Sequence, residues 1–87
     1  MGKFRIVFHR RAAKTFQRLP TDVRRRIEMA IETLKDNPFT GKDVVKLKGK
    51  LAGLYRLRVG TYRVVYSVDE ERQVITVEAV GTRGEVY

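Results

Sequence analysis

Apolar and polar side chains alternate at the start of the chain. Phe4, Ile6 and Phe8 occupy every second position of residues 3–9, and the positions between them are mostly polar. Side chains of an extended strand point alternately to its two faces, so a period of two is typical of a half-buried strand. We therefore predict a first strand over residues 3–9.

The spacing of apolar residues then changes to three and four, which is the period of a helix. A short helix is predicted from Arg10, and a longer one is predicted between Pro20 and Asn37-Pro38. Proline is tolerated in the first turn of a helix but not in its interior, so Pro20 separates the two. The faces expected to be buried carry Ala12, Phe16, Leu19, Val23, Ile27, Ala30, Ile31 and Leu34.

Residues 39–53 show no helical period and are predicted to form a long basic connection. Such a connection in a small domain is usually functional or disordered. After it, alternating runs at residues 54–59 and 62–68 flank Gly60-Thr61. Two residues with glycine first are a favoured β-hairpin turn, so these two runs are predicted to pair.

A turn over residues 69–73 and β-branched residues at 74–80 predict one more strand before the tail. The resulting order is β-α-α-β-β-β. This order predicts an α+β fold, with an antiparallel-rich four-stranded sheet and an N-terminal helical hairpin packed on one face. Eighty-seven residues are enough for one core, so residues 1–87 are expected to form a single domain.

The predicted hairpin turn determines which side chains face one another across the two strands. With Gly60-Thr61 as the loop, Arg58 lies opposite Arg63 and Tyr55 lies opposite Tyr66. The tyrosines and aliphatic residues then face the helices, while Arg56, Arg58 and Arg63 all face away from them. Opposed guanidinium groups repel one another unless an anion lies between them, and they match phosphate oxygens well. The pattern predicts a phosphate-binding sheet face.

The charge of the chain also indicates an anionic partner. The formal net charge is +9. Residues 1–20 carry six basic and no acidic side chains, and residues 41–68 carry seven basic side chains and one acidic side chain. Nucleic acid, an acidic protein or a membrane surface would neutralise such an excess. No apolar run is long enough to span a bilayer and no secretory signal is visible, so we expect a cytoplasmic protein without a membrane partner.

The absence of cysteine excludes disulfides, thiolate metal sites and cysteine nucleophiles. The only histidine, His9, lies at a strand end and is expected to be structural rather than a general base. No metal site and no small-molecule cofactor are therefore expected. Lys46, Lys48 and Lys50 are interpreted as a solvated or phosphate-steering run, and as candidate RNA-binding residues. An equally simple interpretation makes the sheet arginines solvated surface residues or partners of Glu78.

The sequence resembles the RelE/ParE superfamily of toxins from type II toxin–antitoxin systems, over essentially its whole length. The matching segments are Leu19-Pro20, Asn37-Pro38, residues 47–49 (LKG), residues 55–66 (YRLRVGTYRVVY) and residues 81–87 (GTRGEVY). The resemblance implies an antiparallel sheet with an N-terminal helical hairpin, and a cognate acidic antitoxin as partner. For the RelE branch it implies metal-independent cleavage of mRNA in the ribosomal A site, which blocks translation.

By position, the RelE-like resemblance implies a catalytic surface made of Arg56, Arg58, Arg63, Arg83 and Tyr87. Several RelE relatives have lysine where this chain has Arg56 and Arg58, and arginine cannot act as a base as lysine can. Strict alternation along the last strand would direct Arg83 toward the core. A break in the alternation at Gly81 is therefore expected if Arg83 is to join the other arginines.

Two other functions are compatible with the sequence. One is inhibition of DNA gyrase by a ParE-like toxin without nuclease chemistry, and the other is a noncatalytic module that binds RNA or an antitoxin. The joint presence of Arg63, Arg83 and Tyr87 favours RNA cleavage, and the missing lysines favour the alternatives.

Overall fold

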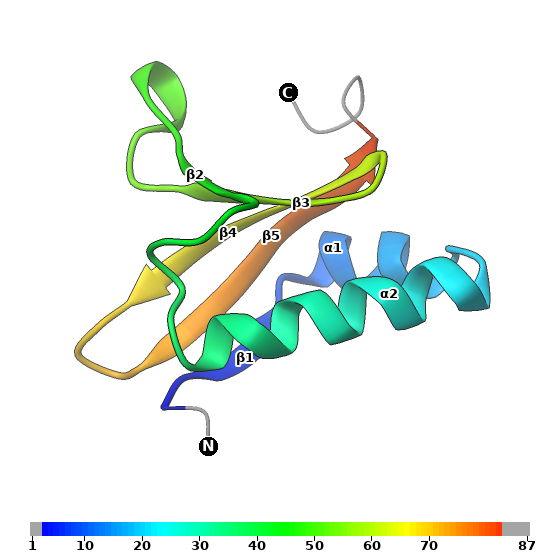
Figure 1. Cartoon of the computed structure of the whole chain (residues 1–87), viewed down its shortest axis with the longest axis horizontal. Helices are drawn as coiled ribbons and strands as arrows, with labels where there is room; N and C mark the ends of the chain where they lie inside the picture. The colour runs from blue at the N-terminus through cyan, green and yellow to red at the C-terminus, as the bar shows by residue number, and fades with distance from the viewer. Residues whose placement is uncertain (1–2, 83–87) are drawn as a thin grey trace.

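The computed structural model describes residues 3–82 and contains two helices and a five-stranded mixed sheet (Figure 1). The helices are α1 (Arg10–Gln17) and α2 (Thr21–Glu32), and α2 continues into the short 3₁₀ turn η1 (Thr33–Lys35). A second 3₁₀ turn, η2, covers Gly49–Leu51. The strands are β1 (Arg5–Phe8), β2 (Val44–Lys46), β3 (Tyr55–Val59), β4 (Tyr62–Asp69) and β5 (Val74–Thr82). In the described part of the chain, neither helix has the length and apolar character needed to cross a bilayer.

The two helices begin where the sequence predicts. His9 caps α1, because its Nδ1 accepts a hydrogen bond from the Arg11 N–H at 3.2 Å. This contact confirms the expected structural role of His9. Pro20 precedes α2, and Asp22 in the first turn interacts favourably with the partial positive charge of the helix N-terminus.

The prediction of a four-stranded sheet was wrong, because the basic connection contains a further strand. The strand order is β1-β5-β4-β3-β2, so β2 forms one edge of the sheet. Val45 pairs with Arg56, and Lys46 pairs with Tyr55. With only three residues, β2 is too short to show a convincing alternation, and its pairing with β3 is what defines it.

The other edge strand, β1, pairs in parallel with β5, whereas the remaining three pairings are antiparallel. The first and last strands of the chain are therefore neighbours, and the sheet is mixed. A parallel pair needs a crossover connection, which the two helices and the three strands between them supply. No local pattern in β1 distinguishes this parallel partner from an antiparallel one.

Both helices lie on one side of the sheet, as predicted, and the core lies between them and the sheet (Figure 1). The most completely buried large side chains are those of Tyr66, Ile27, Leu34, Ile75, Val64 and Val77. The helix α1 contacts β5 and α2 contacts β3, so the helical hairpin supports the sheet from the side opposite the arginines.

A row of aromatic rings ties the segment after α2 to the sheet. Tyr55 stacks on Tyr66 with ring centroids 5.6 Å apart, and Phe39 meets the edge of Tyr55 at 5.8 Å. The Tyr66 hydroxyl donates a hydrogen bond of 2.7 Å to the carbonyl of Pro38. These contacts hold the start of the connection to β2 against the middle of the sheet.

Candidate nucleic-acid interface

The three arginines predicted to share a sheet face do so. In the pairing of β3 with β4, Arg58 lies opposite Arg63, and Arg56 lies opposite Val65. The residues of opposite parity, Tyr55 and Leu57 among them, pack into the core. Gly60, at φ +61°, provides the left-handed conformation that the two-residue turn requires. The register predicted from the turn is therefore confirmed residue by residue.

Arg56 and Arg63 are partly buried residues. Within residues 3–82, the buried Nε atoms of both side chains lack a hydrogen-bond partner. The Nε of Arg24, which lies on α2 and outside this face, is also buried without a hydrogen-bond partner among the described residues. A buried donor without a partner costs about 1–3 kcal/mol, so a ligand that accepts hydrogen bonds at this face would recover that energy.

Arg58 has a partner that the sequence interpretation missed. Its Nη2 lies 3.3 Å from an Oδ1 of Asp43, and its backbone N–H donates to the Asp43 carbonyl at 2.9 Å. Arg58 thus lies between an acid on one side and Arg63 on the other. The alternative partner, Glu78, instead accepts a hydrogen bond of 2.9 Å from the Ser67 hydroxyl.

Replacing Asp43 should make the arginine face a stronger anion binder. In Asp43→Asn, Arg58 loses its counter-charge and becomes free to neutralise one more phosphate. The log–log salt dependence of single-stranded RNA affinity should steepen by about 0.7. The unfolding free energy should fall by less than about 1 kcal/mol, because both side chains are substantially exposed.

Asp36→Asn is the matched control for Asp43→Asn, because it removes the same charge from an exposed position away from β3. Fluorescence anisotropy over a series of salt concentrations measures the slope. Equal slopes for the two variants would show that Asp43 does not restrain Arg58.

A β-bulge in β5 decides which residues of that strand join the arginine face. Tyr66 pairs with Val77, but Val65 pairs with Ala79, so Glu78 is the extra residue. The break in alternation therefore comes before Ala79 and not at Gly81, as had been expected. As a result Val80 is in the core, and Gly81 lies directly opposite Arg63. Arg83 and Tyr87, the remaining predicted catalytic residues, lie outside the described residues.

The lysines predicted to bind RNA are exposed, but they do not all share the arginine face. Lys46 lies opposite Tyr55, on the side of the sheet that faces the helices, while Val45 takes the position next to Arg56. Lys48 and Lys50 belong to the turn between β2 and β3. This turn projects from the sheet on the side away from the helices (Figure 1).

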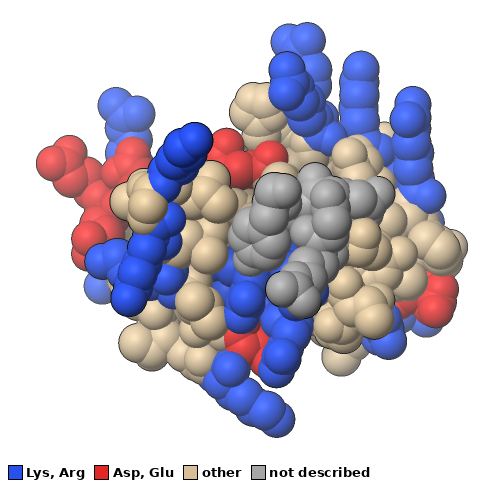
Figure 2. Space-filling view, turned by 90° about the horizontal axis from the view of Figure 1, so that it is seen from above, with Lys and Arg blue, Asp and Glu red and all other residues tan. Residues whose placement is uncertain are grey.

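Positive charge dominates the side of the molecule opposite the helices. In Figure 2, which looks onto this side, Lys and Arg side chains project around most of the face, and the largest acidic group lies at its left edge. No group of three or more His, Asp or Glu side chains within residues 3–82 is arranged to hold a metal ion.

Burial raises the pKa of the Tyr66 hydroxyl above its ordinary value, so this tyrosine remains a neutral donor.

Asp43 is the main residue that sequence reasoning missed at this site. It is the only acidic residue among residues 41–68, and it directly precedes β2. Its position opposite Arg58 follows once β2 is paired with β3. The missed strand therefore explains the missed ion pair.

Comparisons with known proteins agree with this architecture. The family described as "ParE toxin of type II toxin-antitoxin system, parDE" matches residues 6–87. A Methanocaldococcus jannaschii protein that carries the toxin name RelE1 is 33% identical over 87 residues, which span 98% of this chain and 96% of that protein.

Solved structures show the same fold. The archaeal RelE of a RelE–RelB complex from Pyrococcus horikoshii OT3 has a TM-score of 0.80 and 35% identity, covering 97% of this chain and 99% of that one. The isolated E. coli RelE toxin has a TM-score of 0.80 and 30% identity, covering 97% of this chain and 90% of its own. The chain therefore belongs to the ParE toxin family of type II toxin–antitoxin systems, within the RelE/ParE superfamily.

Proposed function

We propose that this toxin is an endoribonuclease that cuts mRNA in the ribosomal A site and thereby blocks translation. The observation that carries the proposal is the arginine face, where Arg56, Arg58 and Arg63 come together on the side of the sheet away from the helices. Within residues 3–82, the Nε atoms of Arg56 and Arg63 have no hydrogen-bond acceptor. A phosphodiester supplies both the negative charge and the hydrogen-bond acceptors that guanidinium groups bind.

In the proposed reaction the RNA 2′-hydroxyl loses its proton and attacks the adjacent phosphorus, and the 5′-oxygen leaves with a proton. Arg56, Arg58 and Arg63 clamp the scissile phosphate and stabilise the charge that develops on it. Arg83 stabilises further charge or assists the leaving group, and Tyr87 stacks on a base or orients the 2′-hydroxyl. Most of the acceleration then comes from alignment and electrostatic stabilisation, for which arginine serves as well as lysine.

The position of Gly81 supports the inclusion of Arg83 in this site. Gly81 lies opposite Arg63 and is two residues before Arg83 in the chain.

The experiment that tests this function maps cut sites in mRNA after the chain is induced in cells. Cleavage within translated codons, absent from untranslated regions of the same messages, is the expected result. Intact messages together with blocked DNA supercoiling would instead establish gyrase inhibition. That second candidate is favoured by the ParE description of the matching family.

The partner that restrains the toxin is proposed to be a cognate acidic antitoxin. The net charge of +9 favours association with an anionic partner. Relatives from Pyrococcus horikoshii and E. coli were solved as complexes of RelE with RelB and as RelBE.

RNA affinity should depend strongly on salt if the arginine face is the binding surface. For about four to six neutralised phosphates on single-stranded RNA, the logarithm of affinity should fall with the logarithm of salt at a slope near −3 to −4. Anisotropy titrations with a labelled oligonucleotide measure this slope. A slope near zero would mean that phosphates contribute little to RNA binding.

A further inference from the structure

An acidic side chain lies in the same row of the sheet as two of the arginines. The backbone N–H of Arg58 donates to the carbonyl of Asp43, so Asp43 lies beside Arg58 where β2 begins. Arg58 lies opposite Arg63, and Arg63 lies opposite Gly81. Residues that pair across neighbouring strands direct their side chains to the same face. Asp43, Arg58, Arg63 and Gly81 therefore form one row that crosses the sheet from the start of β2 to β5.

The Asp43 carboxylate lies within reach of a phosphate bound by this row. Its Oδ1 is 3.3 Å from Nη2 of Arg58, and the Asp43 and Arg58 side chains are 39% and 52% exposed, so a substrate can contact both. A guanidinium group carries five N–H donors, so the contact with Asp43 leaves most of the Arg58 donors for a ligand. A phosphate held between Arg58 and Arg63 would thus lie next to the carboxylate.

The proposed cleavage requires a group that accepts the proton of the 2′-hydroxyl, and the three arginines cannot do so. Arginine side chains stay protonated in proteins, whereas lysine can act as a base. This chain has Arg56 and Arg58 where several RelE relatives have lysine, so the proton acceptor must be a different side chain. A carboxylate within hydrogen-bond reach of a hydroxyl can serve as a general base.

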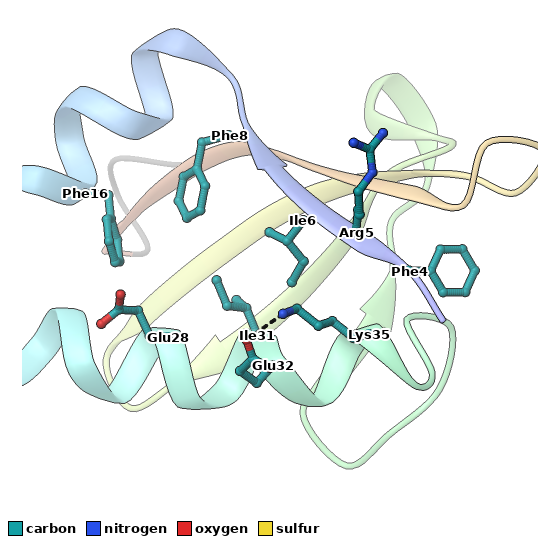
Figure 3. A pocket seen from close by; sticks show the side chains of 9 residues that line it. All are labelled: Phe4, Arg5, Ile6, Phe8, Phe16, Glu28, Ile31, Glu32 and Lys35. Carbon is teal, nitrogen blue, oxygen red and sulfur yellow. Dashed lines mark ion pairs between the residues drawn. The ribbon is translucent and has the colours of Figure 1, made fainter. Parts of the chain in front are cut away.

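Other candidate proton acceptors among the described residues lie away from the row of Asp43. Glu28 and Glu32, on α2, line a hollow of about 660 Å³ between β1 and the helices, on the opposite side of the sheet from the arginines (Figure 3). The single histidine caps α1. Glu78 accepts a hydrogen bond from Ser67, which is four residues and about 13 Å of strand from Arg63. The acidic residues of the turn between β4 and β5 are farther along the same strands.

We propose that Asp43 is the general base of the cleavage reaction. The inference rests on the proposed nuclease function. The Asp43 carboxylate accepts the proton of the 2′-hydroxyl while that oxygen forms a bond to phosphorus. The bond from phosphorus to the 5′-oxygen breaks, its electron pair stays on the 5′-oxygen, and this oxygen takes a proton from water. The RNA is left with a 2′,3′-cyclic phosphate, and Asp43 returns its proton to the solvent. Arg58 holds the carboxylate in place and binds the phosphate with its remaining donors.

Asp43→Asn tests this role, because asparagine has nearly the same shape and still accepts a hydrogen bond from Arg58 but does not take up a proton. Its single-turnover rate of mRNA cleavage on purified ribosomes should be about a hundred to ten thousand times lower than that of the wild type, the usual range for a general base. RNA affinity should not fall, because the substitution removes a negative charge from the arginine face. Asp36→Asn, the matched control, should cleave at the wild-type rate.

The pH dependence separates a base from a residue that merely positions Arg58. In Asp43→Asn hydroxide must remove the proton, so the cleavage rate should increase about tenfold for each pH unit. The wild-type rate should depend on pH much less steeply over the same range, because the Asp43 carboxylate takes the proton instead. Asp43→Glu retains a carboxylate and should recover part of the rate that Asp43→Asn loses. Circular dichroism checks that each variant is folded.

Equal cleavage rates for the wild type and Asp43→Asn would overturn this inference and leave the proposed nuclease standing. A slower Asp43→Asn that keeps the pH dependence of the wild type would also overturn it, because Asp43 would then only position Arg58. Intact messages with the wild-type chain would refute the nuclease itself, and with it the need for a base.

Discussion

Replacing Arg63 or Arg83 with alanine should lower the rate of mRNA cleavage by about a hundredfold or more. This is the scale observed when one preorganised donor to a developing negative charge is removed. Arg63 lies opposite Arg58 and Gly81, at the centre of the proposed site. RNA affinity should fall much less, because the other basic side chains still contact phosphates. Cleavage of a translated message, with affinity measured separately, separates the two effects.

Arg25→Ala is the control for these variants, because Arg25 is exposed on α2 and belongs to the other side of the molecule. It should leave cleavage nearly intact. Arg63→Ala should also fold normally, since it removes a buried Nε that has no partner within the described residues. Toxicity that survives both Arg63→Ala and Arg83→Ala, with messages uncut, would favour gyrase inhibition.

Tyr66→Ala should cause the largest loss of stability, about 3–5 kcal/mol, as for other truncations of a buried aromatic ring. Tyr66 is fully buried, stacks on Tyr55 and bonds to the Pro38 carbonyl. A small domain has only about 5–15 kcal/mol of total stability, so much of the variant should be unfolded at 37 °C. Urea denaturation followed by circular dichroism measures the change.

Tyr66→Phe isolates the hydroxyl and should cost about 1–3 kcal/mol, because the carbonyl of Pro38 loses its donor. It should also alter the pH dependence. Burial raises the pKa of Tyr66 in the folded state, so above about pH 10 the unfolded chain loses this proton while the folded chain keeps it. Wild-type stability should therefore decline more steeply above that pH than the stability of Tyr66→Phe. Parallel curves would contradict this role for the hydroxyl.

The arginine face could be predicted from sequence because its geometry is local. A two-residue turn at Gly60-Thr61 leaves one register for the strands on either side, and that register places Arg58 opposite Arg63. The helices were equally predictable, because their apolar periods and the prolines that bound them lie within short windows.

The features that could not be predicted depend on long-range contacts. Three residues of β2 show no pattern until β3 is placed beside them, and with β2 unknown the pairing of Asp43 with Arg58 was also hidden. The bulge at Glu78 shifts the alternation of β5 without any glycine or proline to mark it. The parallel pairing of β1 with β5 is decided by the whole path of the chain, so no short window of sequence could reveal it.

Because β5 lies between β1 and β4, the strands of the sheet cannot assemble in the order in which they are synthesised. Residues 74–82 are the last strand to leave the ribosome, yet they join the first strand to the rest of the sheet. A nascent chain can form its helical hairpin and the β3–β4 hairpin early, but the strand that unites them is the last of the described strands to be made. The sheet that carries the arginine face therefore cannot be completed until residues 74–82 have left the ribosome.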